Sequence, residues 1–154
     1  MCYHRSSSDA TSLEERNKTL IRSFISEIFN ERNPSSNEKY FAKESVEVSP
    51  HKGNISEGFK QFISEFFKAF PDWRATIEYI VAENNLVVVF LNGSGMHKGE
   101  FHGIPPTNKQ VNMRAAELYK IENERITRHW YVFDQLNLLK QAGTLLSVTP
   151  FVYV

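Results

Sequence analysis

Residues 110–133 read QVNMRAAELYKIENERITRHWYVF, and this stretch decides how the chain folds. Apolar and polar side chains alternate through residues 110–121 and again through residues 125–133, which is the two-residue period of a β-strand. The acidic segment between them, residues 122–124, is typical of a turn. The stretch therefore predicts two neighbouring antiparallel strands joined by a short loop.

The same alternation assigns the side chains of this hairpin to faces. On one face of the second strand lie Thr127, His129, Tyr131 and Phe133, and on one face of the first strand lie Ala115, Glu117 and Tyr119. A carboxylate close to a histidine and a tyrosine can transfer protons to and from a bound molecule. The same residue types also form structural networks in which each group satisfies the others. The pattern leaves both interpretations of this face open.

Two amphipathic helices precede the strands. The first begins at Ser12, with Glu15 at capping-box spacing, and ends before Pro34. The second runs over about residues 56–70 and ends at Pro71, whose ring cannot continue the helix. Aromatic stripes at helical spacing are more often core than cavity lining, so we interpret the stripe of the second helix as core. That stripe includes Phe59, Phe62, Phe66 and Phe70.

The remaining elements complete the sheet. Residues 75–82 and 86–91 predict a further hairpin, and residues 46–48 predict a short strand before the second helix. A last helix follows over residues 134–142, with Asp134 interpreted as its N-cap rather than as an active-site acid. This order of elements predicts an α+β fold, with helices on one face of a curved antiparallel sheet.

Length and composition bound the class of protein. At 154 residues the chain has the length of one domain, which we place at residues 13–143, between a disordered tail (1–12) and a C-terminal extension (144–154). Equal numbers of acidic and basic side chains disfavour binding to nucleic acid or to an anionic membrane. The single cysteine, Cys2, excludes an intramolecular disulfide. Without a signal-like or membrane-spanning apolar segment, we expect a cytoplasmic protein.

Short motifs after the second helix carry a resemblance to a known family. Residues 97–107 read HKGEFHGIPPT, residues 120–122 read KIE, His129 and Trp130 follow, and residues 141–143 read QAG. In this order the motifs resemble the SnoaL-like polyketide cyclases, a family that includes proteins called predicted ester cyclases. The resemblance implies the nuclear transport factor 2-like fold, a cone of strongly bent antiparallel sheet closed by helices. It also implies a homodimer, to which Trp130 would contribute from the outer face of the sheet, and no metal or cofactor.

The resemblance also implies roles for individual residues, and the sequence departs from the family at these positions. The family's catalytic Asp, at the third position of a His-Trp-Asp motif, is replaced here by Tyr131. A histidine of the preceding strand is replaced by Glu117, and another histidine by Val48. We predict Glu117, Tyr131 and His129 as the catalytic candidates. The predicted ligand contacts are Glu47, His51, Tyr119 and Phe133.

Two hypotheses follow for function. The first is a cofactor-independent cyclase or isomerase that transfers protons on a small, largely apolar, oxygenated molecule. In that case Glu117 is the base and Tyr131 an orienting donor, because a phenol is a poor base at neutral pH. The second is a non-catalytic ligand-binding or dimerisation module that kept the fold and lost the catalytic Asp.

Three histidines, His51, His97 and His102, raise the question of a zinc site. His97 and His102 lie five residues apart in a glycine-rich turn rather than on one helix face, and no cysteine supports them. We therefore expect no metal. His97 is instead expected to hydrogen-bond within the bend and His102 to be solvated. The glycines at positions 93, 95, 99 and 103 are interpreted as points where the sheet bends.

Overall fold

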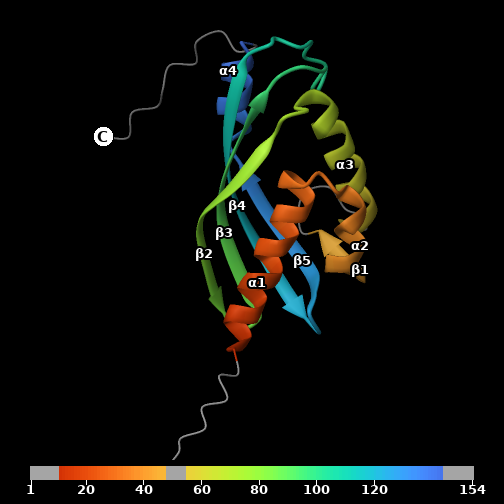
Figure 1. Ribbon diagram of the computed structural model, residues 1–154, viewed down its shortest axis with the longest axis vertical. Helices are drawn as coiled ribbons and strands as arrows, with labels where there is room; N and C mark the ends of the chain where they lie inside the picture. The colour runs from red at the N-terminus through yellow and green to blue at the C-terminus, as the bar shows by residue number, and fades with distance from the viewer. Residues whose placement is uncertain (1–10, 48–54, 144–154) are drawn as a thin grey trace, which may run out of the picture.

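Helices on one face of a five-stranded sheet make up the described part of the chain, residues 11–47 and 55–143 of the computed structural model (Figure 1). The strands stand in the order β1-β5-β4-β3-β2. The α+β class predicted from the sequence is confirmed, with a curved and unclosed sheet. The strands are β1 (Phe41–Glu47), β2 (Arg74–Glu83), β3 (Leu86–Met96), β4 (Gln110–Glu122) and β5 (Arg125–Phe133).

Strand β1 is the exception to the predicted sheet. Strands β2 to β5 form the expected antiparallel meander, but β1 pairs with β5 in the parallel direction. The prediction of a wholly antiparallel sheet is therefore wrong at this edge. The rest of the sheet separates β1 from β5 along the chain, so no tight hairpin fixes their relative direction. The strand also begins at Phe41, earlier than the predicted residues 46–48, because the Phe41 ring is buried in the core.

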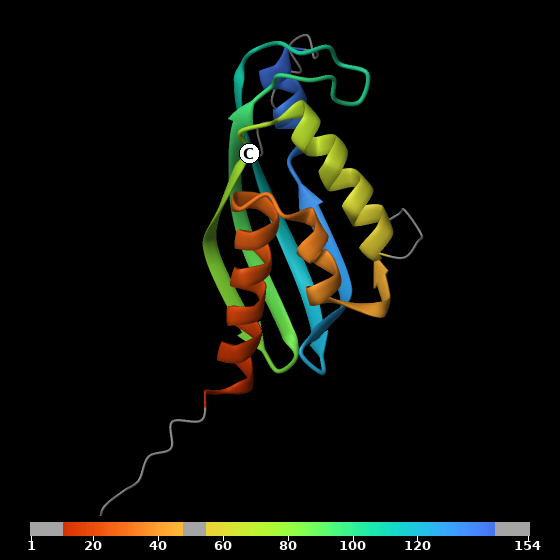
Figure 2. The same cartoon turned by 45° about the vertical axis from the view of Figure 1, so that its right-hand side comes forward.

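Two long helices cover the inner face of the sheet (Figure 2). Helix α1 (Leu13–Ile25) packs against β2 and β3, and the Ser12 hydroxyl caps it by accepting a hydrogen bond from the Glu15 N–H at 3.2 Å. Helix α3 (Ile55–Ala69) covers the other half of the same face, and α4 (Gln135–Ala142) lies against β4 at one end. Between α1 and β1 stand a π-helical turn η1 (Ser26–Asn30), a 3₁₀ turn η2 (Pro34–Ser36) and a short helix α2 (Asn37–Tyr40).

The main core lies between α1, α2 and the sheet. Its centre is Phe24, which has no exposed surface. The Phe24 ring contacts those of Tyr40, Phe41 and Tyr119 at centroid distances of 5.4, 5.4 and 5.9 Å. Burying one such side chain contributes about 1.5–3 kcal/mol. Because Tyr119 is itself fully buried here, the core closes off the space above β4 at this point.

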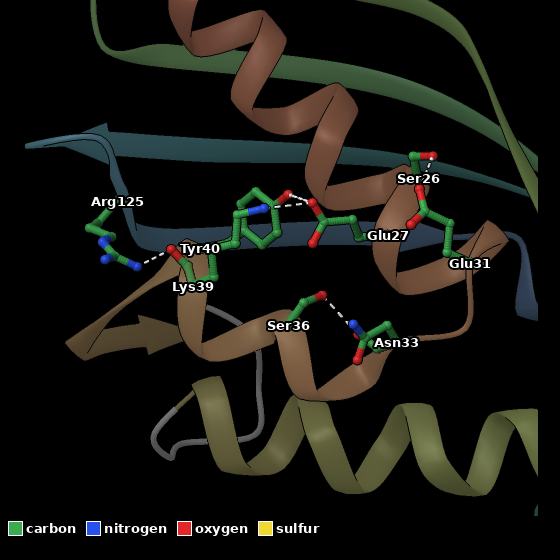
Figure 3. Close-up of polar contacts among 8 residues, drawn as sticks. All are labelled: Ser26, Glu27, Glu31, Asn33, Ser36, Lys39, Tyr40 and Arg125. Carbon is green, nitrogen blue, oxygen red and sulfur yellow. Dashed lines mark hydrogen bonds and ion pairs between the residues drawn. The ribbon is translucent and has the colours of Figure 1, made fainter.

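A polar cluster ties the short helical elements to the sheet (Figure 3). The Glu27 carboxylate in η1 accepts hydrogen bonds from the Lys39 ammonium and the Tyr40 hydroxyl, both at 2.6 Å. These two partners lower the pKa of Glu27 below its ordinary value. The Arg125 guanidinium, at the start of β5, donates to the Lys39 carbonyl. We refer to Glu27, Lys39, Tyr40 and Arg125 as the outer cluster.

The C-terminal helix is capped as the sequence predicts. The Asp134 carboxylate accepts a hydrogen bond from the Asn137 N–H at 3.0 Å, and Gly143 ends the helix with a φ of +86°. The predicted tail, apart from residues 11 and 12, and the predicted C-terminal extension lie outside the described residues. Within residues 11–47 and 55–143, no helix is both long and apolar enough to cross a membrane.

Candidate functional site

An apolar cavity of about 540 Å³ separates α3 from the inner face of the sheet. Its apolar lining consists of Phe29, Phe59, Phe62, Phe66, Trp73, Ala75, Leu91, Met113, Ala115 and Phe133. Its polar side chains are His102, Glu117, His129, Tyr131 and Gln135. No lysine or arginine is among the described lining residues. An apolar cavity with a few convergent polar groups is the usual form of a small-molecule site.

Glu117, His129 and Tyr131 line the closed end of the cavity, and the buried Tyr119 lies directly behind them. We call these four side chains of β4 and β5 the polar floor. In the strand pairing Glu117 lies opposite Tyr131, and Tyr119 lies opposite His129. Paired residues of neighbouring strands point to the same side of a sheet. The face predicted from the alternation of the hairpin is therefore the face that meets the cavity.

Two neighbours hold the Glu117 carboxylate within the polar floor. The Tyr119 hydroxyl donates a hydrogen bond to Glu117 Oε2, and His129 Nε2 lies 3.2 Å from the same oxygen. The imidazole stacks on the Tyr119 ring with centroids 4.6 Å apart. Burial, followed by the nearby carboxylate, raises the pKa of Tyr119 well above its ordinary value, so this phenol remains a donor. The Glu117 side chain keeps 13% exposure, which leaves it accessible from the cavity.

The cavity has a closed end and an open end along β4. Met113, Ala115 and Glu117 occupy successive inward positions and all line the cavity. At about 3.3 Å per residue these positions span roughly 13 Å. The next inward residue, Tyr119, is fully buried, so the cavity closes there. The loop of residues 97–109 connects β3 to β4 beyond the other end, and His102 of this loop lines the cavity.

A tryptophan just before β2 forms one wall. Trp73 is buried and packs edge-on against Phe66, with centroids 4.9 Å apart. Its indole lies so close to β3 that a Cβ atom at Gly93 would come within 2.2 Å of the ring. A Cβ at Gly95 would approach the same ring to 3.0 Å. At these two positions, the glycines interpreted from the sequence as bends make room for the indole.

The structure brings five of the predicted site residues together, namely Glu117, Tyr119, His129, Tyr131 and Phe133. Glu47 ends β1 at a backbone position paired with His129, but its side chain lies outside the described part of the chain. His51 also lies outside the described residues. Ligand contacts through Glu47 and His51 stay predictions.

Sequence reasoning missed part of the cavity wall. The interpretation of Phe59 and Phe66 as core is incomplete, because these side chains also line the cavity. For Phe62 it is wrong, because this side chain is 39% exposed and lines the cavity outside the core clusters. His102 is exposed, as expected, but it lines the open end as well. The one sequence feature that could have pointed to His102 as a cavity residue is its position before Gly103, in the turn that precedes Pro105 and Pro106. The stripe on α3 gave no signal, since an aromatic helix face has the same pattern against a core or a cavity.

The remaining histidine of the bend is structural. His97 Nδ1 lies 3.1 Å from the Thr107 hydroxyl, as predicted, and the imidazole stacks on Phe70. It has 1% exposure, and this burial lowers the pKa of His97 below its ordinary value. Among the residues that the structure describes, no group of three or more His, Cys, Asp or Glu is placed to hold a metal ion.

One family model matches most of the chain. The family model described as SnoaL-like polyketide cyclase matches residues 19–142. No curated protein sequence matches the chain. Among solved structures, AclR, a candidate hydroxylase from Streptomyces galilaeus, is 25% identical with a TM-score of 0.78, over 86% of this chain and 83% of AclR.

Two further structures are named as candidate polyketide cyclases. The protein from Acidithiobacillus ferrooxidans is 28% identical with a TM-score of 0.74, over 86% of this chain and 97% of its own. IdmH from Streptomyces antibioticus is 26% identical with a TM-score of 0.71, over 82% of this chain and 98% of its own.

Proposed function

Because the chain belongs to the SnoaL-like polyketide cyclase family, we propose that it binds a small, largely apolar, oxygenated molecule in the cavity and transfers a proton on it without a cofactor. The polar floor carries this proposal. It presents a carboxylate that is accessible from an apolar cavity and held by a histidine and a tyrosine. The two structural relatives named as candidate polyketide cyclases support this class of reaction.

The position of Glu117 supports its role as the base. The family resemblance implies a catalytic Asp at the position of Tyr131, and Glu117 lies directly opposite Tyr131 on the neighbouring strand. Directly opposite residues have Cβ atoms about 4.5–5.5 Å apart. A carboxylate on β4 can therefore reach the same bound atom as one on β5. In this proposal the catalytic carboxylate comes from β4 instead of from the neighbouring strand β5.

The proposed step is proton removal from a carbon next to a carbonyl group of the ligand. Glu117 takes the proton, the C–H bond breaks, and its electron pair forms a C=C bond while negative charge develops on the carbonyl oxygen. Tyr131 donates a hydrogen bond to that oxygen, and His129 and Tyr119 orient the carboxylate. A positioned base contributes about 10²–10⁴-fold to the rate. The apolar walls exclude water that would compete for the proton.

A non-catalytic ligand-binding module is the second candidate. The phenol at position 131 favours it, because a phenol is a poor base at neutral pH. A Glu–His–Tyr network can also be purely structural. Both candidates bind an apolar molecule in the cavity, but only the first exchanges protons with it.

The test uses 2-acetylnaphthalene, a flat ketone whose methyl protons exchange slowly in neutral water. Proton NMR in D₂O follows the loss of the methyl signal, and fluorescence titration measures binding. Protein-dependent exchange that disappears in Glu117→Gln supports the enzyme. Binding without exchange supports the binding module, and the absence of binding contradicts both candidates.

A matched pair of variants tests whether the ligand occupies the cavity. Ala115 lines the cavity, whereas Ala116 is the next residue of β4 and faces the other side of the sheet. Ala115→Leu fills the cavity and should weaken binding by about tenfold, which corresponds to about 1.4 kcal/mol. Ala116→Leu should leave binding nearly unchanged. Equal effects of the two changes would place the ligand elsewhere.

We also propose that the chain forms a homodimer through the outer face of the sheet. Tyr79, Val81, Phe90 and Val132 are large apolar side chains exposed on this face, by 69, 59, 48 and 70%. Trp130 shares the face, and aromatic side chains are favoured in such contacts. The zero net charge weakens repulsion between copies. Light scattering should give twice the chain mass for the wild type and one chain mass for Val132→Glu; a monomeric wild type contradicts the proposal.

A further inference from the structure

We propose that His102 is a ligand-contacting residue which, when protonated, donates a hydrogen bond to a negatively charged oxygen of the bound molecule at the open end of the cavity. This inference rests on the proposed function, since it concerns the same cavity. It assigns two polar ends to the ligand. A hydroxyl or carbonyl group lies at the polar floor, and an oxyanion lies at His102.

The backbone presents His102 at the tip of a tight turn. Phe101 and Ile104 exchange both of their backbone hydrogen bonds at 3.0 Å, so His102 and Gly103 form a two-residue hairpin loop. The two loop residues have φ angles of +50° and +79°, the signs of a type I′ turn. Asn, Asp and Gly usually fill these positions, and a bulkier residue there is conformationally unfavourable. From this turn the His102 side chain lines the cavity.

The loop that carries His102 is anchored to the rest of the molecule. The Ala69 carbonyl, at the end of α3, accepts hydrogen bonds from the N–H groups of Lys98 and Gly99 at 2.8 and 3.1 Å. At the base of the loop, the His97 N–H donates to the Lys109 carbonyl at 2.9 Å. Gly99 lies so close to α3 that a Cβ atom on Gly99 would come within 2.3 Å of the Lys68 carbonyl oxygen. The loop therefore holds His102 against the cavity.

The charges of the lining favour this role for His102. Glu117 is the one carboxylate of the described lining, and the two histidines are its only side chains that can become cationic. His129 already faces Glu117 at the closed end, with 3.2 Å between Nε2 and Oε2. An anionic oxygen at the open end therefore has His102 as its cationic partner. Hydrogen bonds between charged groups are roughly twice as strong as neutral ones.

Other charged side chains lie near His102, and the experiment must separate them. A smaller cavity of about 300 Å³ is lined by His102 together with Glu65 and Lys68 of α3 and Glu100 of the loop. The two carboxylates oppose an anion beside His102. Lys68 is a fixed cation that could bind the same oxygen. Lys68→Gln is therefore the matched control for His102.

The probes are 6-hydroxy-2-naphthoate, which carries a hydroxyl and a carboxylate at opposite ends of a flat ring system, and its neutral methyl ester. Fluorescence titration gives the Kd of each at about pH 5.5 and about pH 8.5, a range in which histidine changes its charge. We expect the wild type to bind the carboxylate probe about tenfold more tightly at the lower pH. The ester should show no such dependence, and it serves as the control for changes elsewhere in the cavity.

His102→Asn tests the assignment while keeping the turn, because asparagine adopts positive φ readily. We expect this variant to bind the carboxylate probe about tenfold more weakly at the lower pH and without pH dependence, and to lose less affinity for the ester than for the carboxylate. Equal pH dependence in the wild type and His102→Asn overturns the proposal, as does loss of carboxylate binding in Lys68→Gln. Failure of the ester to bind the wild type contradicts the proposed function itself, and this inference with it.

Discussion

The outer cluster and the polar floor are built from the same chemistry and differ in their surroundings. In the outer cluster, the Glu27 carboxylate accepts a hydrogen bond from the Tyr40 hydroxyl and pairs with Lys39 at 2.6 Å. In the polar floor, the Glu117 carboxylate accepts a hydrogen bond from the Tyr119 hydroxyl and faces a histidine at 3.2 Å. The first cluster stands between helical elements, and the second stands at the end of an apolar cavity.

The partner of each carboxylate separates the two roles. Lysine is a permanent cation at neutral pH, so Glu27 is held as a permanent anion and its cluster fastens η1 to α2. In the polar floor the partner of the carboxylate is an imidazole that lines the cavity, so this pair can contact a bound molecule. A Glu–Tyr pair alone therefore does not identify a site, whereas its position at the cavity does.

We expect the largest effect from replacing Glu117, and almost none on the same measurement from replacing Glu27. Glu117→Gln keeps the size of the side chain but removes the base, so proton exchange of 2-acetylnaphthalene should fall by about 10²–10⁴-fold. Glu27→Gln lies outside the cavity and should leave the exchange rate nearly unchanged. NMR exchange rates, with thermal unfolding of both variants as control, decide the matter. Full exchange in Glu117→Gln would refute this choice of base and make His129 the next residue to test.

Tyr131 provides the next largest effect. Tyr131→Phe removes the donor to the developing oxyanion, and we expect turnover to fall by about 10–10²-fold with Kd nearly unchanged. Tyr131→Asp, combined with Glu117→Gln, returns a carboxylate to the family position and should restore part of the exchange. Unchanged turnover in Tyr131→Phe would show that this residue lines the cavity without donating a hydrogen bond in the reaction.

Tyr119 and Tyr40 each donate a hydrogen bond to a carboxylate, and their removal should change the free energy of unfolding by different amounts. Tyr119→Phe deprives a partly buried carboxylate of a donor, which costs about 1–3 kcal/mol, whereas Glu27 keeps Lys39 in Tyr40→Phe and the cost is about 0.5–1.5 kcal/mol. Urea unfolding measures both values. Only Tyr119→Phe should also slow proton exchange. Equal costs would show that Glu27 depends on its tyrosine as strongly as Glu117 does.

Local patterns in the sequence predicted the hairpin that carries the polar floor. Alternation through residues 110–133 indicates which side chains share a face. The turn alone would set Glu117 opposite Trp130, and a bulge in the pairing between Lys120 and Ile121 shifts the register so that Glu117 lies opposite Tyr131. The cap at Asp134 is equally local, since it depends on residues three positions apart. The shared face and the cap were correct because each is determined within a few residues of the chain, whereas the bulge was not predicted.

Features that depend on distant segments could not be read in this way. The direction of β1 depends on its contact with the last strand, and no local pattern encodes it. The cavity exists because α3 stands off the sheet, with Trp73 of a different segment seated on Gly93. The left-handed backbone of His102 was not predicted either, because a histidine in the sequence, unlike a glycine, does not by itself indicate a positive φ.

The smallest expected effect concerns acid and the outer cluster. The hydrogen bonds from Lys39 and Tyr40 lower the pKa of Glu27 in the folded protein below its ordinary value of 4.5. As the pH falls, the unfolded chain therefore binds this proton before the folded chain does. The stabilisation that Glu27 provides is fully present above about pH 4.5 and is lost as the pH falls through the folded-state value.

Thermal unfolding of the wild type and Glu27→Gln tests this linkage. The wild type should have the higher Tm at neutral pH, and the difference should shrink between about pH 5 and about pH 3 as the carboxylate is protonated. The difference should be small, because ion pairs near the surface are screened by solvent. Glu83→Gln, at the exposed last residue of β2, controls for the loss of one negative charge. A Tm difference that does not vary with pH would mean that Glu27 stabilises the cluster without its charge, which would remove the electrostatic distinction between the outer cluster and the polar floor.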